Sequence, residues 1–240
     1  MLDDGWTHTD CYEGSVTSED PESEDTINVD DAYSLETPDD SRRLYAKWAS
    51  TYDQDFIAPN GYVYHENVAA AFCDAGGSAG GAVLDVGCGT GIVGVALGDI
   101  GEKQIDGIDI SPEMLDVARM KRTVFGDLAY RSLFVADLTE QLDIPDDSYN
   151  GIVSVGTFTH GHLSAEPIRE LVRIAAPSAV CAIGINAEHY VEMGFDALFS
   201  ELSHAGVITS PTNIDVSIYE AMRGEHAGDR ANVAIFQVLA

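Results

Sequence analysis

Residues 83–91, Val-Leu-Asp-Val-Gly-Cys-Gly-Thr-Gly, constrain the fold more strongly than any other stretch of the chain. The apolar run 82–86 leads into Gly87, Gly89 and Gly91, and apolar residues then recur at helical spacing. A strand, a tight glycine turn and a helix form the first unit of a nucleotide-binding α/β sheet. Because glycine has no Cβ, the backbone of such a turn can approach a ligand closely.

Asp85, the acid within this apolar run, indicates which ligand to expect. A carboxylate at the strand end repels a pyrophosphate but suits a ligand with a cationic amine and a sulfonium, which favours S-adenosylmethionine over NAD. The dinucleotide fingerprint is G-x-G-x-x-G, whereas here Gly91 comes one residue early and Ile92 stands where that fingerprint has glycine. A dinucleotide site and a purely structural glycine turn remain the alternatives.

Strand and helix patterns alternate after residue 82 and predict a doubly wound, mostly parallel sheet of the Rossmann-like α/β class. The expected strands cover 82–86, 104–109, 132–136, 150–155 and 179–185, with two more near 207–209 and 231–238. The expected helices cover 91–99, 112–121, 165–175 and 192–205. Two helices precede this domain, one starting near Ser41 with Asp39, Asp40 and Ser41 as candidate caps, and one over 63–75.

Three regions are therefore expected. Residues 1–40 form an acidic, mostly disordered arm, because they hold too few apolar residues to offset chain entropy. Residues 41–81 form a helical lid that ends in a glycine-rich connector, and residues 82–240 form the cofactor-binding domain. The arm is interpreted as a solvated tail, with an acidic interaction segment as the alternative.

The chain carries 41 acidic and 12 basic residues, a net charge of −29, and residues 1–41 hold 14 of the acids and no base. Because 27 acids and 12 bases remain in 42–240, the acidity is global, and it excludes nucleic acid as the default partner. A halophilic source and an acidic mesophilic protein are both compatible with this charge. Four scattered cysteines without a C-x-x-C pair indicate reduced thiols, and the absence of an 18-residue apolar run indicates a soluble, cytoplasmic protein.

Ligands of doubly wound sheets lie across the carboxyl ends of the strands, so the residues that end each strand are the candidate contacts. Asp109 ends the second strand and can accept hydrogen bonds from ribose hydroxyls. Met114 lies in the next helical turn and either contacts the adenine or belongs to the core. Asp137 ends the third strand and either accepts the adenine amine or caps its own turn. Gly156 ends the fourth strand and permits close approach of the ligand.

These segments resemble class I S-adenosylmethionine-dependent methyltransferases over residues 42–205, and most of all the small-molecule group that includes the methyltransferase-like protein of the Williams–Beuren region. The segments that carry the resemblance are 45–53 (Tyr-Ala-Lys-Trp-Ala-Ser-Thr-Tyr-Asp), 85–91, 109–115 with Ile110 and Met114, Asp137-Leu138, and 156–162. The resemblance implies a seven-stranded sheet whose last strand is antiparallel. It also implies that Asp85 and the glycine loop hold the methionine end, Asp109 the ribose and Asp137 the adenine.

The sequence departs from the group's pattern at three places. Asn150 replaces the usual Asp that opens the fourth strand, and residues 176–179 lack the usual Lys-Pro-Gly-Gly turn. Both changes affect a turn, and we expect cofactor binding to be unaffected. His65 stands where the group often has Pro, which leaves the shape of the substrate lid open.

The lid and the loops after the fourth and fifth strands supply the candidates for chemistry. Tyr45, Trp48 and Tyr52 share one helix face, and we expect Trp48 in the core and both tyrosines near the cofactor. His160 and His162 follow the fourth strand and are candidate general bases, or else polar residues that line the pocket. His189 and Tyr190 are expected to face the methyl group as well. The H-x-H spacing lacks a third ligand, so no metal is expected.

The sequence thus predicts a methyltransferase that moves a methyl group from S-adenosylmethionine to a small or unidentified acceptor by in-line displacement. An NAD-type oxidoreductase and a non-catalytic cofactor-binding module with a regulatory role are the two alternatives. The sequence leaves the acceptor atom and the oligomeric state open.

Overall fold

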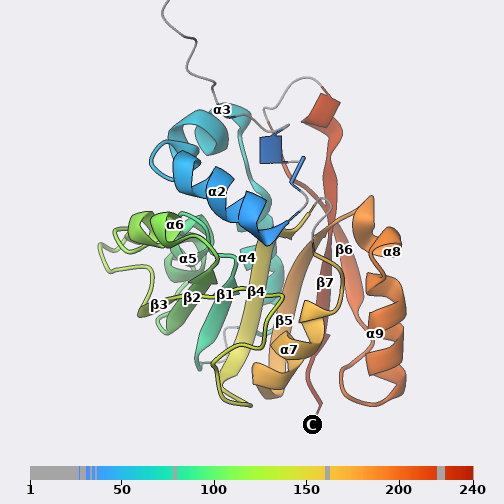
Figure 1. The fold of residues 1–240 in the computed structure, drawn as a ribbon. Helices are drawn as coiled ribbons and strands as arrows, with labels where there is room; N and C mark the ends of the chain where they lie inside the picture. Colours follow the sequence, from blue (N-terminus) through green and yellow to red (C-terminus); the bar gives the residue numbers. More distant parts are fainter. Residues whose placement is uncertain are drawn as a thin grey trace, which may run out of the picture.

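The computed structural model describes residues 27, 31–32, 34–35, 37–77, 80–159, 163–220 and 225–239. These residues build a seven-stranded sheet in the order β3-β2-β1-β4-β5-β7-β6 (Figure 1). The strands are β1 (Val83–Val86), β2 (Ile105–Asp109), β3 (Ser132–Val135), β4 (Tyr149–Phe158), β5 (Ala175–Asn186), β6 (Thr212–Ser217) and β7 (Arg230–Gln237). Because β7 pairs antiparallel with both β5 and β6, it alone runs against the other six, which confirms the predicted sheet.

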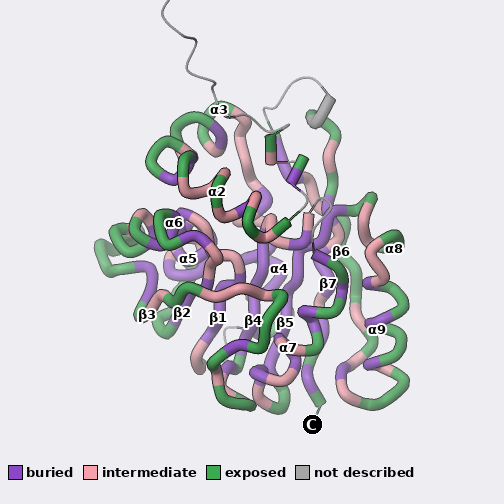
Figure 2. The backbone as a smooth tube through the Cα atoms, in the orientation of Figure 1, coloured by how far each residue is buried: buried purple, intermediate pink, exposed green. Residues whose placement is uncertain are grey.

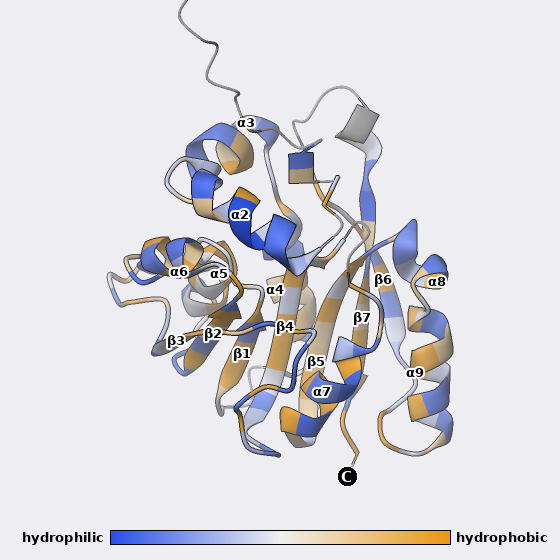
Figure 3. Cartoon of the chain, viewed as in Figure 1, coloured by the Kyte–Doolittle hydropathy of each residue, from blue (hydrophilic) through white to orange (hydrophobic). Residues whose placement is uncertain are grey.

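Helices cover both faces of this sheet, and each face has its own apolar cluster. One face packs against α4 (Tyr64–Asp74), α5 (Ile92–Asp99) and α6 (Pro112–Ala118), and the other against α7 (Pro167–Ile174) and α9 (Phe195–His204). Burial is concentrated in the central strands, whereas the outer turns of the helices are exposed (Figure 2). The central strands are predominantly hydrophobic, as expected for parallel strands that are covered on both faces (Figure 3).

The lid lies over one end of the sheet and consists of α2 (Pro38–Trp48), a π-helical turn η1 (Asp53–Ile57) and the short α3 (Ala58–Asn60) (Figure 1). Helix α2 begins earlier than predicted. Thr37 is its N-cap and accepts a hydrogen bond from the Asp40 amide at 3.1 Å, and Pro38 takes the first helical position. The expected caps Asp39, Asp40 and Ser41 therefore lie inside the helix. Residues 1–26 of the expected disordered arm lie outside the described residues.

One expected element near the carboxyl terminus is wrong, and another, the helix that corresponds to α9, begins later than expected. The strand expected at 207–209 is a single bridge between Ile208 and Val238, and β6 begins at Thr212. Strand β6 is a largely exposed edge strand, and it was missed although Ile214, Val216 and Ile218 alternate with polar residues. The helix expected at 192–205 is broken at Gly194, whose φ of 82° separates α8 (His189–Glu192) from α9.

Strand β4 is longer than predicted and carries an irregularity next to the site. Its pairing with β5 shifts register between Ser154 and Phe158, where Gly156 has a φ of 73°. Such a bulge turns the strand end and re-aims the residues that follow it. The end of β4 is thereby directed toward the space beneath the lid.

Candidate functional site

A cavity lies between the lid and the carboxyl ends of β1, β2, β3 and β4. Its empty space is about 1040 Å³, which includes the open mouth. The lining residues used below are Tyr45, Tyr52, Tyr62, Gly87, Gly89, Thr90, Asp109, Ile110, Met114, Asp137, Leu138, Gly156 and Thr157. This position agrees with the rule that ligands of open α/β sheets bind at the strand ends.

The glycine loop forms the floor of the cavity. The amides of Gly87 and Cys88 both donate to the Ile108 carbonyl, at 2.8 and 2.9 Å, which holds the loop against β2. A Cβ on Gly87, whose φ is 68°, would lie 2.0 Å from the Thr157 hydroxyl, so a side chain does not fit there. A Cβ on Gly89 would meet no atom within 4 Å, which leaves its backbone open toward the cavity.

Asp109 connects this loop to β2. Its carboxylate accepts hydrogen bonds from the amides of Gly89 and Ser111, both at 2.8 Å. Burial raises the pKa of Asp109, while the amides of Ser111, Gly89 and Ile110 oppose that rise. Each carboxylate oxygen keeps a free lone-pair direction, because an ionised carboxylate can accept about four hydrogen bonds. The geometry is therefore suited to a ligand with neighbouring hydroxyls.

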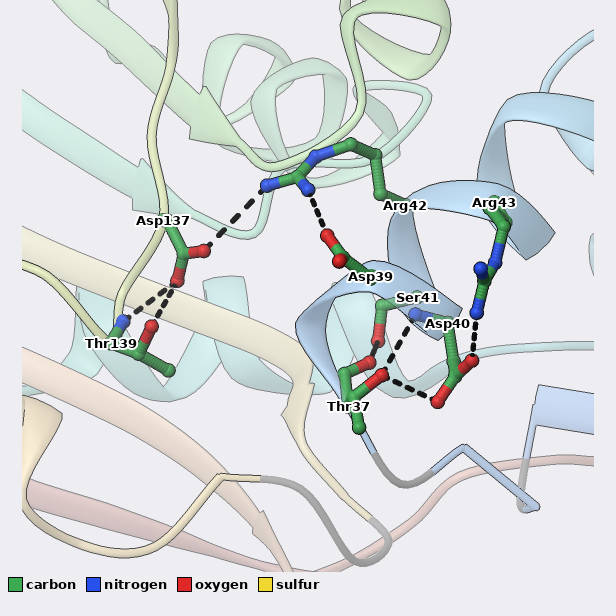
Figure 4. A network of polar contacts seen from close by, with 8 residues as sticks. All are labelled: Thr37, Asp39, Asp40, Ser41, Arg42, Arg43, Asp137 and Thr139. Atoms are coloured by element: carbon green, nitrogen blue, oxygen red, sulfur yellow. Dashed lines mark hydrogen bonds and ion pairs between the residues drawn. The ribbon is translucent and has the colours of Figure 1, made fainter.

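A second carboxylate, Asp137, lies at the end of β3. One of its oxygens accepts from the amide and hydroxyl of Thr139, at 2.9 and 2.7 Å. The other lies 3.6 Å from the Arg42 guanidinium of α2, which also pairs with Asp39 (Figure 4). Asp137 thus caps its own turn and also contacts the lid, and it faces the cavity next to Leu138.

Apolar side chains complete this end of the cavity. Ile110 and Met114 both line it, and Met114 is only 2% exposed. Met114 therefore belongs to the core and also lines the cavity, and its contact with the adenine stays a prediction. The Ser111 hydroxyl accepts from the Met114 amide at 3.3 Å and caps α6, as the sequence predicts.

Three tyrosines from the lid form the roof. Tyr45, Tyr52 and Tyr62 line the cavity, whereas Trp48 is buried at 2% exposure beneath them, with its ring centroid 4.9 Å from that of Tyr52. Burial raises the pKa of Tyr45 to about 12 and that of Tyr52 and Tyr62 well above 10. All three phenols are therefore neutral at physiological pH. They can donate or accept hydrogen bonds, but they do not act as anionic bases.

Asp53, in the π-helical turn of the lid, ties the lid to the glycine loop. Its carboxylate accepts a hydrogen bond from the Thr90 hydroxyl at 2.7 Å and forms an ion pair with Lys121. Thr90 is 1% exposed and lines the cavity, so Asp53 of the lid, which does not itself line the cavity, holds a residue that does. Asp53 belongs to the 45–53 segment that carries the resemblance, but no contact between it and the loop was foreseen.

The structure places Asp85 and Gly91 beneath the cavity, because neither residue lines it. Asp85 is fully buried and accepts a hydrogen bond from the Tyr130 hydroxyl at 2.6 Å, while its other oxygen has no partner among the described residues. Burial raises the pKa of Asp85 to about 7. The expectation that this carboxylate faces the ligand directly therefore does not match the geometry.

The candidate bases cannot be placed, because His160 and His162 lie outside the described residues. His189 and Tyr190 do not line the cavity, in contrast to the expectation. Tyr190 instead accepts a hydrogen bond from Asn213 at 3.0 Å and packs near Phe195.

Among the described residues, no group of three or more His, Cys, Asp or Glu could hold a metal ion. Within the same residues, no helix is both long and apolar enough to cross a membrane.

Sequence reasoning missed several cavity residues. Tyr62 follows a turn, where no periodicity marks it, and its bridge to Tyr219 brings it over the site. Pro38 and Ser41 also line the cavity, although they fall at the edge of the expected acidic arm. The sequence signal that could have identified them is Thr37-Pro38, a cap followed by proline at the first helical position.

Comparisons with known proteins support this geometry. Residues 83–178 match the methyltransferase domain family. Human methyltransferase-like protein 27 is 30% identical over 151 residues, 60% of this chain and 58% of that protein. Ajmaline N-methyltransferase from Rauvolfia serpentina is 32% identical over 101 residues, 42% of this chain and 34% of that protein. The matches thus span about half or less of the length of each curated relative.

Solved structures share the fold at low sequence identity. The [4+2]-cyclase SpnF is 15% identical, with a TM-score of 0.61 over 85% of this chain and 97% of that one. A putative S-adenosylmethionine-dependent methyltransferase from Methanococcus maripaludis is 18% identical, with a TM-score of 0.55 over 82% and 93%. Residues 83–178 thus match a methyltransferase domain, and the sheet order and the glycine loop agree with the fold that the solved S-adenosylmethionine-dependent methyltransferase shares with this chain.

Proposed function

We propose that this protein transfers a methyl group from S-adenosylmethionine to a small-molecule acceptor. The observation that carries the proposal is one cavity that combines the open backbone of Gly89, the carboxylate of Asp109 and a roof of tyrosines. In this proposal Asp109 binds the ribose hydroxyls, and Asp137 accepts from the adenine amine. Ile110, Met114 and Leu138 enclose the adenine ring.

The methionine end of the cofactor is assigned to the floor formed by Gly87, Gly89 and the turn up to Gly156. Gly91 and Asp85 support that floor from below and make no direct contact in this proposal. The bound cofactor supplies an activated methyl group on a sulfonium. The faces of Tyr45 and Tyr52 suit a cationic sulfur through cation–π attraction, worth roughly 0.5–2 kcal/mol.

Methyl transfer to a nucleophile needs alignment of the acceptor more than acid–base chemistry. Tyr45, Tyr52 and Tyr62 are neutral donors at physiological pH and are proposed to orient the acceptor by hydrogen bonds. A hydroxyl acceptor also needs a base, and His160 or His162 is proposed for that role because both follow β4. Full turnover after each is replaced by Ala would remove the histidines from the mechanism.

A small acceptor is favoured because the cavity is largely roofed by the lid and the chain carries a net charge of −29. That charge repels the phosphates of nucleic acids. A cytoplasmic location is proposed from the reduced-thiol pattern of the cysteines. The fold alone does not fix the reaction, since SpnF is a cyclase on the same architecture.

The proposal is tested by thermal shift with S-adenosylhomocysteine and with NAD, followed by an acceptor screen with labelled S-adenosylmethionine. We expect stabilisation by S-adenosylhomocysteine and none by NAD, because Ile92 replaces the third dinucleotide glycine. Stabilisation by NAD alone would refute the assignment. Tight cofactor binding without an acceptor in a broad screen would favour a non-catalytic, regulatory module.

A further inference from the structure

Tyr130 precedes β3 in the chain, and its side chain is buried beneath the glycine loop. Its hydroxyl donates to the Asp85 carboxylate of β1 at 2.6 Å and accepts from the Gly94 amide of α5 at 3.0 Å. One side chain therefore bridges the strand that enters the glycine loop and the helix that leaves it. Residues 87–90, which lie between those two attachment points, form the cavity floor.

The ring of Tyr130 fits into a notch made by three glycines. A Cβ on Gly91 would lie 2.9 Å from the ring, one on Gly94 would lie 2.2 Å from it, and one on Gly107 would lie 3.0 Å from it. Gly89 differs, because its added Cβ would meet nothing. Gly89 is thus open to the cavity, whereas Gly91, Gly94 and Gly107 make room for Tyr130.

We infer that Tyr130 is a positioning residue for the cofactor, which fixes the end of β1 against the first turn of α5 and thereby sets the shape of the cavity floor. The inference rests on the proposed function, since the floor is where the methionine end is assigned. Ile92 and Val93, in the same helical turn as Gly94, line the cavity. A shift of that turn therefore moves cavity atoms directly.

Asp85 makes the bridge sensitive to pH. The groups that face its carboxylate are Tyr130, Cys88 of the loop and Asp109 of β2, and no cation is among them. Tyr130 is thus the donor that supports the ionised form, and it opposes the effect of burial on the pKa of Asp85. Removing the hydroxyl raises that pKa further, so the cost of the removal increases as pH rises.

The test compares Tyr130→Phe with Tyr64→Phe. Tyr64 is 1% exposed, and its hydroxyl has no hydrogen-bond partner among the described residues, so it is a matched control for loss of a buried hydroxyl. For Tyr130→Phe we expect S-adenosylhomocysteine to bind about tenfold more weakly by calorimetry, about 1.4 kcal/mol. We also expect a loss of Tm that is larger at pH 8.5 than at pH 6. Tyr64→Phe should change neither quantity.

Two further variants keep the test decisive. In the Asp85→Asn background, the Tm loss caused by adding Tyr130→Phe should not depend on pH, since Asn does not ionise. Gly94→Ala should weaken S-adenosylhomocysteine binding although Ala favours a helix, because its Cβ displaces the ring. If Tyr130→Phe does not fold, Gly94→Ala still tests whether the position of the Tyr130 ring affects S-adenosylhomocysteine binding.

The inference is overturned if Tyr130→Phe binds S-adenosylhomocysteine like wild type, or if its Tm loss is the same at both pH values. If wild type itself does not bind S-adenosylhomocysteine, the proposed function fails. In that case the pH-dependent Tm comparison still decides whether Tyr130 supports Asp85.

Discussion

Replacing Asp53 by Ala tests whether the lid holds the cofactor in place. The change leaves the buried Thr90 hydroxyl without its acceptor and removes the ion pair with Lys121. A hydrogen bond to a charged group contributes about 1.5–3 kcal/mol. Because the Asp53 and Lys121 side chains are 31% and 24% exposed, solvent screening lowers this to about 1–2 kcal/mol.

The contacts of Asp53 stabilise the closed lid by this energy. When they are lost, a smaller fraction of the molecules has a closed lid, and the affinity for a ligand beneath the tyrosines falls with that fraction. We therefore expect S-adenosylhomocysteine to bind about 5- to 30-fold more weakly. Stopped-flow fluorescence should show most of the loss in the dissociation rate, because the roof must move for the ligand to leave. Asp55→Ala is the matched control, since Asp55 lies in the same π-helical turn but is exposed.

Wild-type affinity and dissociation rate in Asp53→Ala would refute the lid argument. A loss of equal size in Asp55→Ala would show that the effect comes from the charge of the turn and not from the contact with Thr90. A second check is salt dependence. Added salt should weaken S-adenosylhomocysteine binding less in Asp53→Ala than in wild type, because the variant has no ion pair to screen.

Four other changes are predicted. Asp109→Ala should weaken S-adenosylhomocysteine binding by at least tenfold in calorimetry, because the loop amide and the ribose lose one acceptor. Ser178→Gly should raise Tm by up to about 4 °C, since Ser178 has a φ of 69° that glycine adopts freely. Arg42→Ala should change the affinity less than threefold, because its ion pair with Asp137 is 3.6 Å long and the two side chains are 42% and 25% exposed. Because the pKa of Asp85 is about 7 when folded and about 3.9 when unfolded, wild-type stability should fall as pH rises from 4 to 7, and Asp85→Asn should remove that fall.

The sequence predicted the sheet because its signals are local. Residues 83–91 and the acids at 109 and 137 mark strand ends, and in a parallel sheet all of these ends meet at one edge. Asp109, Asp137 and Gly89 therefore line a common cavity, as their spacing predicted. Edge strand β6 was missed although Ile214, Val216 and Ile218 alternate with polar residues, a pattern that does indicate a strand.

The role of Asp85 could not be predicted from the sequence, because it depends on a contact over 45 residues. Tyr130 lies in a segment without motif or periodicity, and only the folded chain shows its hydroxyl on Asp85. The contact of Asp53 with Thr90, 37 residues apart, was missed for the same reason. Motif spacing thus locates the residues that face the ligand, whereas the residues that support them come from tertiary packing.

A crystal structure of the protein with S-adenosylhomocysteine tests the central claim most directly. We expect the ribose hydroxyls on the Asp109 carboxylate, the adenine next to Asp137 and Met114, and the sulfur beneath Tyr45 and Tyr52. Asp85 should remain bonded to Tyr130 without touching the ligand. The account is contradicted if S-adenosylhomocysteine binds elsewhere, or if saturating concentrations leave this cavity without it.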